Sequence, residues 1–378
     1  MAGTAAPGRL SPAPGRVRFD IAGPADEPDL RRLLRQTPLG GGYRLTLERE
    51  PDALAADFGL AGAATYVIAR DGDSGAAIGM CERVVRLAHV DGAVRRLPYL
   101  AALRVHPDAR GRIAILRGGF AALRAVEQPD DAPFALTSIT ADNHAARRLL
   151  TAGIDGLPLY RPVGDFLTHA LRPRRCRPRA AIAPACLDDL PALTAFLDRH
   201  NRRRQFAPHW RDGDLARLAD AGLPPHRILL ARVDGEIRGS IALWDQRAHR
   251  QTVMRGYPPV VAALRPALNR LAPLLRLPTL PPLGEPLAQA VAALHTAEAD
   301  DAELALDLVA AALTEAARLR FSVVILGLAA DHPWCAPLKR RYGGLTYRTS
   351  LYLAHWPEAR EAVAALGPAL PAPELGFL

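Results

Sequence analysis

The stretch at residues 104–125, RVHPDARGRIAILRGGFAALRA, predicts a strand that runs into a loop and then into a helix. A loop that enters a helix presents unpaired backbone N–H groups and the positive end of the helix dipole, and both attract phosphate. Gly111 allows the backbone to approach such an anion closely, and Arg110 and Arg112 add positive charge. Apolar residues recur at helical spacing and predict the face that packs on a sheet: Ile113, Leu116, Phe120 and Leu123.

Composition restricts the class of protein. The 378 residues suffice for two domains, and 49% hydrophobic with 23% charged residues indicates a globular chain. No apolar run approaches the ~20 residues that span a bilayer, so we expect no membrane partner. Residues 1–15 lack the apolar core of a secretory signal and are expected to be a disordered lead-in.

The net charge of +9 comes almost entirely from arginine, because Lys339 is the only lysine. Arginine, alanine, proline and glycine are jointly abundant, as in GC-rich coding sequences, so a nucleic-acid partner is unlikely on charge alone and an anionic ligand stays possible. The four scattered cysteines show no metal-ligand spacing, so neither a disulfide framework nor a metal site is expected, and free thiols suit a cytoplasmic location.

The order of strand and helix patterns predicts an α/β protein in two parts. Residues 16–171 read as an N-terminal domain, 172–184 as a proline- and arginine-rich linker, and 185–378 as a C-terminal domain. Within the first part we also expect a helix around 51–60, and within the second a strand along 244–257 and a strand rather than a helix at 287–300.

The two parts end alike. Each runs from a buried strand through Ala-Asp, a short helix and glycine to Tyr-Arg and a last strand, and Asp142 to Tyr160 matches Asp331 to Tyr347 within two residues. This ordered series indicates an internal duplication.

The motifs of the first part resemble the GNAT superfamily of acyl-CoA-dependent N-acyltransferases. Val105, Pro107, Arg110 and Gly111 match that family's V-x-P-x-x-R-G pyrophosphate loop, and Asn143 with Ala146 matches its later N-x-x-A helix. The resemblance implies two tandem GNAT-like domains. Each would be a mostly antiparallel mixed sheet with a central splayed pair of parallel strands, flanked by helices. The second domain matches only in the order of its elements.

The resemblance also implies a cofactor site. Acetyl-CoA or another acyl-CoA would be a co-substrate, with its thioester in the splay between the strands at 94–105 and 134–140. The residues implied in binding are Leu103, Val105, Arg110, Gly111, Arg112, Ile113 and Asn143.

The sequence departs from the family pattern at Ile113, at Ile115, which stands where the family has glycine or alanine, and at Leu150. Ile113 replaces the second loop glycine, and Leu150 stands where the family often has a tyrosine that protonates the thiolate, which leaves Tyr160 as a substitute. Gly118 and Gly119 lie inside the expected helix, where they either permit close packing on the sheet or mark an anion site displaced by one turn with Arg117.

A general base must reach the acceptor amine directly or through one water, and the strands offer Glu82, His89 and Tyr99. In the second part, His295 and Glu298 end a strand with no recognisable phosphate loop after it. Two cationic clusters, 198–206 and 244–257, are either solvated surfaces or acceptor-binding elements.

Two functions therefore stay open. The first is an acyl-CoA-dependent N-acyltransferase, most simply an N-acetyltransferase, acting on a small-molecule or peptide amine as a monomer or homodimer. The alternative is a catalytically degenerate double-GNAT scaffold, which the replacements at Ile113 and Leu150 favour.

Overall fold

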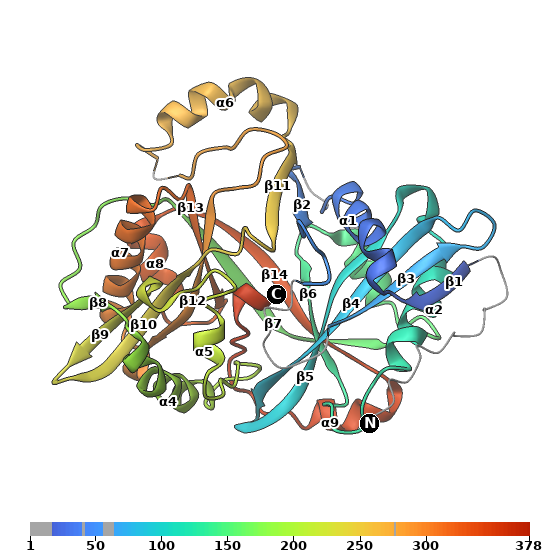
Figure 1. Cartoon of the computed structure of the whole chain (residues 1–378), viewed down its shortest axis with the longest axis horizontal. Coiled ribbons are helices and arrows are strands. Elements are labelled where there is room, and N and C mark those ends of the chain that lie inside the picture. The colour runs from blue at the N-terminus through green and yellow to red at the C-terminus, as the bar shows by residue number, and fades with distance from the viewer. Residues whose placement is uncertain (1–16, 40–41, 56–63, 276) are drawn as a thin grey trace.

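The computed structural model describes residues 17–39, 42–55, 64–275 and 277–378, and Figure 1 shows them as a wide sheet with helices on both faces. The mixed α/β fold predicted from the sequence is confirmed. No helix in these described ranges is long and apolar enough to cross a bilayer. The expected lead-in at 1–15 lies outside the described residues.

The first half contributes the following elements, in chain order: β1 (Val17–Ile21), α1 (Glu27–Gln36), β2 (Arg44–Glu48), β3 (Ala64–Asp71), β4 (Ala77–Val90), β5 (Ala93–Val105), α2 (Ile113–Arg124), β6 (Ala135–Thr140), α3 (His144–Leu150) and β7 (Leu159–Leu171). The apolar face predicted for α2 is confirmed, since Leu116, Phe120 and Leu123 are buried and Ile113 packs against the same cluster.

The second half contains β8 (Ile182–Pro184), α4 (Leu190–Asn201), α5 (Asp214–Arg217), β9 (Ile228–Val233), β10 (Glu236–Trp244), β11 (Gln251–Gly256), α6 (Pro259–Leu271), β12 (Gln289–Ala297), α7 (Ala302–Arg318), β13 (Val323–Ala329), α8 (Cys335–Tyr342), β14 (Leu345–His355) and α9 (Arg360–Ala364). Helices α7 and α8 cover one face of its strands, while α4 and α5 cover the other.

Twelve strands form one continuous sheet in the order β1-β3-β4-β5-β6-β14-β7-β13-β12-β10-β9-β8. The last strands of the two halves have exchanged places: β14 pairs with β6, and β7 pairs with β13. Each half keeps one parallel pair, β5 with β6 and β12 with β13. The exchange joins the halves through main-chain hydrogen bonds, so neither half could complete its own sheet alone.

The first glycine of the pair inside α2 serves packing, whereas a Cβ atom on Gly119 would make only an ordinary contact with Cys81. A Cβ atom on Gly118 would lie 2.1 Å from Phe19 Cε2, so only glycine lets α2 approach β1 this closely. Arg117 does not face an anion site, because its Nε donates to the Asp155 carbonyl at 2.9 Å.

Several local expectations are wrong. Residues 51–55 form a turn, and the rest of the helix expected at 51–60 lies outside the described residues. The strand expected along 244–257 is interrupted between β10 and β11. Helix α6 was not expected, because prolines at 258, 259 and 266 obscure its pattern. The strand at 287–300 is confirmed as β12.

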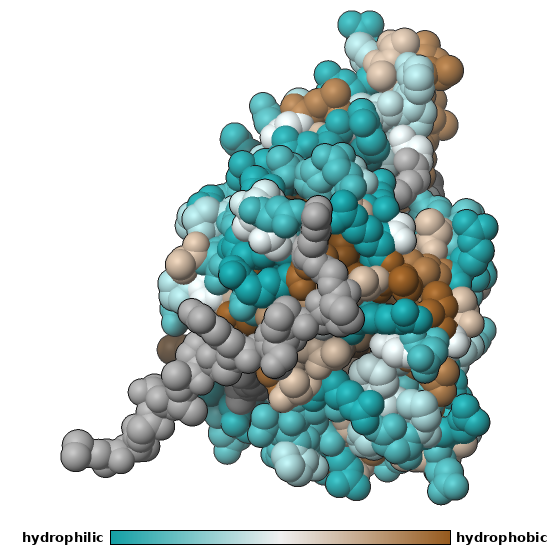
Figure 2. Space-filling model, turned by 90° about the vertical axis from the view of Figure 1, so that its right-hand side faces the viewer, coloured by the Kyte–Doolittle hydropathy of each residue, from teal (hydrophilic) through white to brown (hydrophobic). Residues whose placement is uncertain are grey.

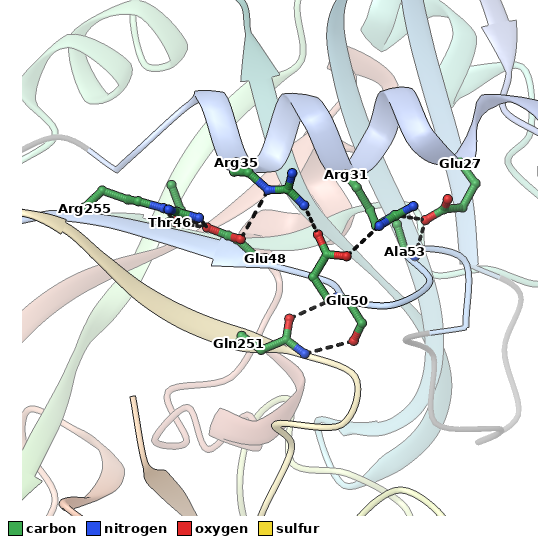
Figure 3. Close-up of polar contacts among 9 residues, drawn as sticks. All are labelled: Glu27, Arg31, Arg35, Thr46, Glu48, Glu50, Ala53, Gln251 and Arg255. Atoms are coloured by element: carbon green, nitrogen blue, oxygen red, sulfur yellow. Dashed lines mark hydrogen bonds and ion pairs between the residues drawn. The ribbon is translucent and has the colours of Figure 1, made fainter. Parts of the chain in front are cut away.

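A second, two-stranded sheet of β2 and β11 also bridges the halves. Figure 3 shows the polar network around it, in which Gln251 exchanges two hydrogen bonds of 2.9 Å with the backbone of Glu50. Arg31 and Arg35 of α1 pair with the Glu50 carboxylate, and Arg255 of β11 pairs with Glu48. These ion pairs hold the two-stranded sheet and Glu50 against α1.

Candidate active site

The parallel strands β5 and β6 separate soon after they meet. They pair only at Tyr99–Leu136 and Leu100–Thr137, and β5 then bulges at Ala102, whose φ of +48° is rare outside glycine. The bulge shifts the register between β5 and β4. Met80 opposes Arg104 and Glu82 opposes Ala101, so two steps along β4 correspond to three steps along β5. From Leu100 to Val105 the strand is half-buried, which leaves a splay that a ligand can enter.

The loop after β5 forms an anion cradle. Gly111 has φ +84°, and a Cβ there would meet nothing within 4 Å, so glycine is needed for the backbone conformation alone. Among the described residues, the backbone N–H groups of residues 111–114 donate to no acceptor, and the next amide, Ile115 N, donates to the Arg112 carbonyl. Arg110 and Arg112 are exposed beside these amides. The arrangement suits a phosphate or pyrophosphate.

Ile113 does not fill the cradle. Its side chain packs into the cluster under α2, together with Leu103 and Val105 of β5. Asn143 caps α3 by accepting from Ala146 N at 3.2 Å, so its side chain holds the helix that borders β6. Behind the bulge lies an apolar cavity of about 20 Å³, lined by Gly79, Leu103 and Val105 among others.

Glu82 is committed to an ion pair at the edge of the splay. Its carboxylate receives two hydrogen bonds from the Arg49 guanidinium, one of 2.8 Å, and lies 3.0 Å from the Tyr66 hydroxyl. Burial alone would raise the pKa of Glu82, but the Arg49 charge and these hydrogen bonds hold the pKa at about 2. A carboxylate with so low a pKa is a weak base, so we assign Glu82 to positioning rather than to proton abstraction.

Further arginines approach the same region. Arg104 of β5 is enclosed, and burial together with the Arg49 charge lowers its pKa to about 10. Arg250, from the second half, likewise has its pKa lowered to about 9 by burial and by Arg49. Three arginines, Arg49, Arg104 and Arg250, therefore lie near the single carboxylate of Glu82. This excess of positive charge favours the binding of an anionic group of a ligand.

Of the two proposed catalytic tyrosines, Tyr99 borders the splay, whereas Tyr160 lies on β7, which β14 separates from β6. The Tyr99 hydroxyl lies 2.8 Å from Ser138 Oγ, which joins β5 to β6 where they part. Tyr160 of β7 packs edge-on against Tyr352 at 6.0 Å between ring centroids. Burial raises the pKa of Tyr160, and the nearby Cys81 thiol raises it further by a smaller amount. The phenol therefore stays protonated at neutral pH.

His89 lies elsewhere. It is seven residues along β4 from Glu82, roughly 23 Å at the rise of a strand. Its Nε2 is 2.8 Å from Asp198 Oδ1, and His209 Nδ1 is 2.7 Å from the same oxygen. His89, Asp198 and His209 lie close enough together to hold a metal ion. If a metal bound His89 Nε2, however, the neutral imidazole would carry its proton on Nδ1. That Nδ1 atom is buried and has no hydrogen-bond acceptor among the described residues. The triad is better described as a hydrogen-bonded joint between the halves.

The corresponding bulge of the second half is occupied by the chain itself, although a cavity of about 190 Å³ adjoins the ends of β12 and β13. Strand β12 bulges at Leu294, with φ +50°, and the Leu294 N–H donates to Glu374 Oε2 at 3.0 Å. Helix α7 is capped by Asp301, whose Oδ1 accepts from Glu303 N and Leu304 N, so its amides are already used. In the described residues of this half, Glu374 therefore occupies the bulge amide and Asp301 occupies the first amides of α7.

Of the polar residues noted at the end of β12, Glu298 has an ionic partner, whereas the buried His295 Nδ1 has no hydrogen-bond partner among the described residues. His295 lines a cavity of about 190 Å³ with His332 and Trp334, and burial lowers the pKa of both histidines to about 4. Glu298 lies 3.3 Å from Arg199. In the cationic cluster 198–206, Arg204 pairs with Asp300 at 2.6 Å.

Comparison with known proteins identifies the fold. No family model and no curated protein matches the sequence. Two structures of Saccharomyces cerevisiae N-myristoyltransferase with bound myristoyl-CoA are similar. One has a TM-score of 0.58 at 12% identity, covering 92% of this chain and 84% of that one. The other has a TM-score of 0.61 at 11% identity, covering 94% and 85%.

A GCN5-related N-acetyltransferase from Sphaerobacter thermophilus is also similar, with a TM-score of 0.54 at 18% identity, covering 90% of this chain and 96% of that one. The chain therefore has the GNAT fold, as the motif at 104–125 predicted.

Proposed function

We propose that the protein is an acyl-CoA-dependent N-acyltransferase that holds its acyl donor in the first half. The observation that carries this proposal is the asymmetry of the two bulges. The β5 bulge is open and leads into a loop with unused amides, whereas the β12 bulge is occupied by Glu374. The similar yeast enzyme binds myristoyl-CoA, which supports an acyl-CoA donor here.

In this proposal the pyrophosphate lies on the amides of residues 111–114, with Arg110 and Arg112 beside it. A backbone N–H of β5 near Leu103–Val105 polarises the thioester carbonyl. The acceptor amine attacks the thioester carbon, the C–N bond forms and the C–S bond breaks. The Tyr160 phenol, protonated at neutral pH, is our candidate to protonate the departing thiolate. The proton that the amine nitrogen loses passes to solvent water, from which the Tyr160 phenolate is later reprotonated.

The acyl group and the second half are further parts of the proposal. We propose acetyl as the acyl group, because the cavity behind the bulge, at about 20 Å³, leaves no room for a long chain. The repeated bulge, parallel pair and final β-α-β series support an origin of the two halves by duplication. The second half would then serve the acceptor side, where Arg250 adds positive charge.

Calorimetric titration with CoA and acetyl-CoA tests the proposal. We expect saturable binding, and Arg110→Ala should weaken it about tenfold, because one charge-assisted hydrogen bond contributes about 1.5 kcal/mol. Arg124→Ala is the matched control at the other end of α2, where Arg124 contacts Glu358, and its affinity should be unchanged. Folded protein that fails to bind either ligand at millimolar concentration would instead support the scaffold alternative.

A further inference from the structure

Helix α6 projects from the molecule beside β11 (Figure 1), and none of its residues is buried. Val260, Leu264 and Leu271 are 69%, 51% and 49% exposed, and Leu274 just beyond the helix is 80% exposed. Their spacing of four, seven and three residues places them on one side of the helix. Figure 2 shows hydrophobic side chains at the top of the molecule, where this part projects.

The polar side of α6 faces the protein. Arg265 Nη1 donates to the Pro281 carbonyl at 3.0 Å, and Asn269 exchanges hydrogen bonds of 3.0 and 2.7 Å with the backbone of Leu280. An amphipathic surface helix normally buries its apolar side. Here the orientation is reversed, and polar contacts fix it.

The sequence around the exposed apolar side of α6 contains arginine and tyrosine. Residues 251–284 contain four arginines and no acidic residue in the sequence, and of these Arg255 is neutralised by Glu48 while Arg276 lies outside the described residues. Arg270 is exposed on α6. Tyr257 lies just before the helix and contacts Tyr43 edge-on at 6.0 Å, and Tyr43 is 46% exposed. Leucines flanked by arginine and tyrosine are the composition of helices that lie in the interface of a bilayer.

We propose that α6 docks on the surface of an anionic lipid bilayer, with Val260, Leu264, Leu271 and Leu274 inserted among the acyl chains. The docking is peripheral and does not require the proposed acyl transfer. It replaces the sequence-based expectation of no membrane partner, which rested on the lack of a spanning segment. A second copy of this chain fits less well, because pairing two α6 helices would bring arginines together without an acidic residue in 251–284 to balance them.

Cosedimentation with sucrose-loaded vesicles tests the docking. The full chain should bind vesicles of three parts phosphatidylcholine to one part phosphatidylglycerol at least tenfold more tightly than pure phosphatidylcholine. Binding should weaken in 0.5 M salt. Val260→Ser/Leu264→Ser/Leu271→Ser should reduce binding at least tenfold. Leu187→Ser/Val233→Ser, which changes residues that are 67% and 55% exposed elsewhere, should bind as the unmodified chain does.

All three substituted positions on α6 are exposed, so an unchanged thermal transition would confirm that the triple variant is folded. Absence of vesicle binding by the unmodified chain, or equal binding by the triple variant, would overturn the proposal. A dimer in light scattering that the triple variant converts to a monomer, without vesicle binding, would overturn it as well and assign the face to a second copy.

Discussion

Replacing Arg49 by methionine is expected to lower the free energy of unfolding by about 3–5 kcal/mol. Arg49 and Glu82 are only 8% and 1% exposed, and the substitution leaves a buried carboxylate without its main partner. Urea unfolding at pH 7 measures the change. Arg35→Met removes a half-exposed arginine that pairs with Glu50 (Figure 3), and it should cost no more than about 1 kcal/mol.

The pH dependence gives a second readout of this pair. The pKa of Glu82 in the folded protein, about 2, lies below its ordinary 4.5, so the stabilisation is complete above pH 4.5 and is lost as the pH falls toward 2. Arg49→Met/Glu82→Leu should recover most of the lost stability, since it removes both charges. If Arg49→Met alone left the free energy of unfolding unchanged, the ion pair would not organise the edge of the splay.

The free energy of unfolding of the unmodified chain is expected to fall by about 3 kcal/mol between pH 4.5 and 7 because of Glu374. Replacing Glu374 by glutamine should remove this decrease. Burial raises the pKa of Glu374 from 4.5 to about 7, against the hydrogen bond from Leu294 N. Between these values the folded state holds a proton that the unfolded state has lost, so stability decreases as the pH rises. Glutamine does not titrate, so the variant lacks this decrease.

The measurement is the difference in unfolding free energy between the unmodified chain and Glu374→Gln at several pH values. Other groups titrate alike in both proteins and cancel in the difference. Glu361→Gln, an exposed change on α9, should follow the unmodified chain throughout. Parallel pH curves for the unmodified chain and Glu374→Gln would show that Glu374 does not occupy the bulge of β12 as a buried carboxyl group.

Local features of the fold could be predicted from the sequence because they are encoded by neighbouring residues. The strand, loop and helix at 104–125 follow from the apolar spacing and from Gly111, and the cap at Asn143 follows from its place before an amphipathic segment. The exchange of β7 and β14 could not be predicted, because both strands carry similar apolar patterns and nothing local selects the partner edge.

The site was only partly predictable for the same reason. Residues on β5 and in its loop were found from the motif, whereas Arg49, Arg250 and Glu374 come from segments distant in sequence and have no motif of their own. The charge of Glu82 and the closed bulge at Leu294 depend on those tertiary contacts. An arginine inside the apolar strand, Arg104, was the one local signal of an enclosed charge.

Amide hydrogen exchange with and without CoA tests the central claim most directly, because it locates the ligand. Our account predicts slower exchange at the amides of residues 111–114 and along β5 from Ala101 to Val105. It predicts no change at residues 298–304, where Asp301 already accepts from the first amides of α7. Protection confined to 298–304, or no protection at saturating CoA, would contradict an acyl-CoA site in the first half.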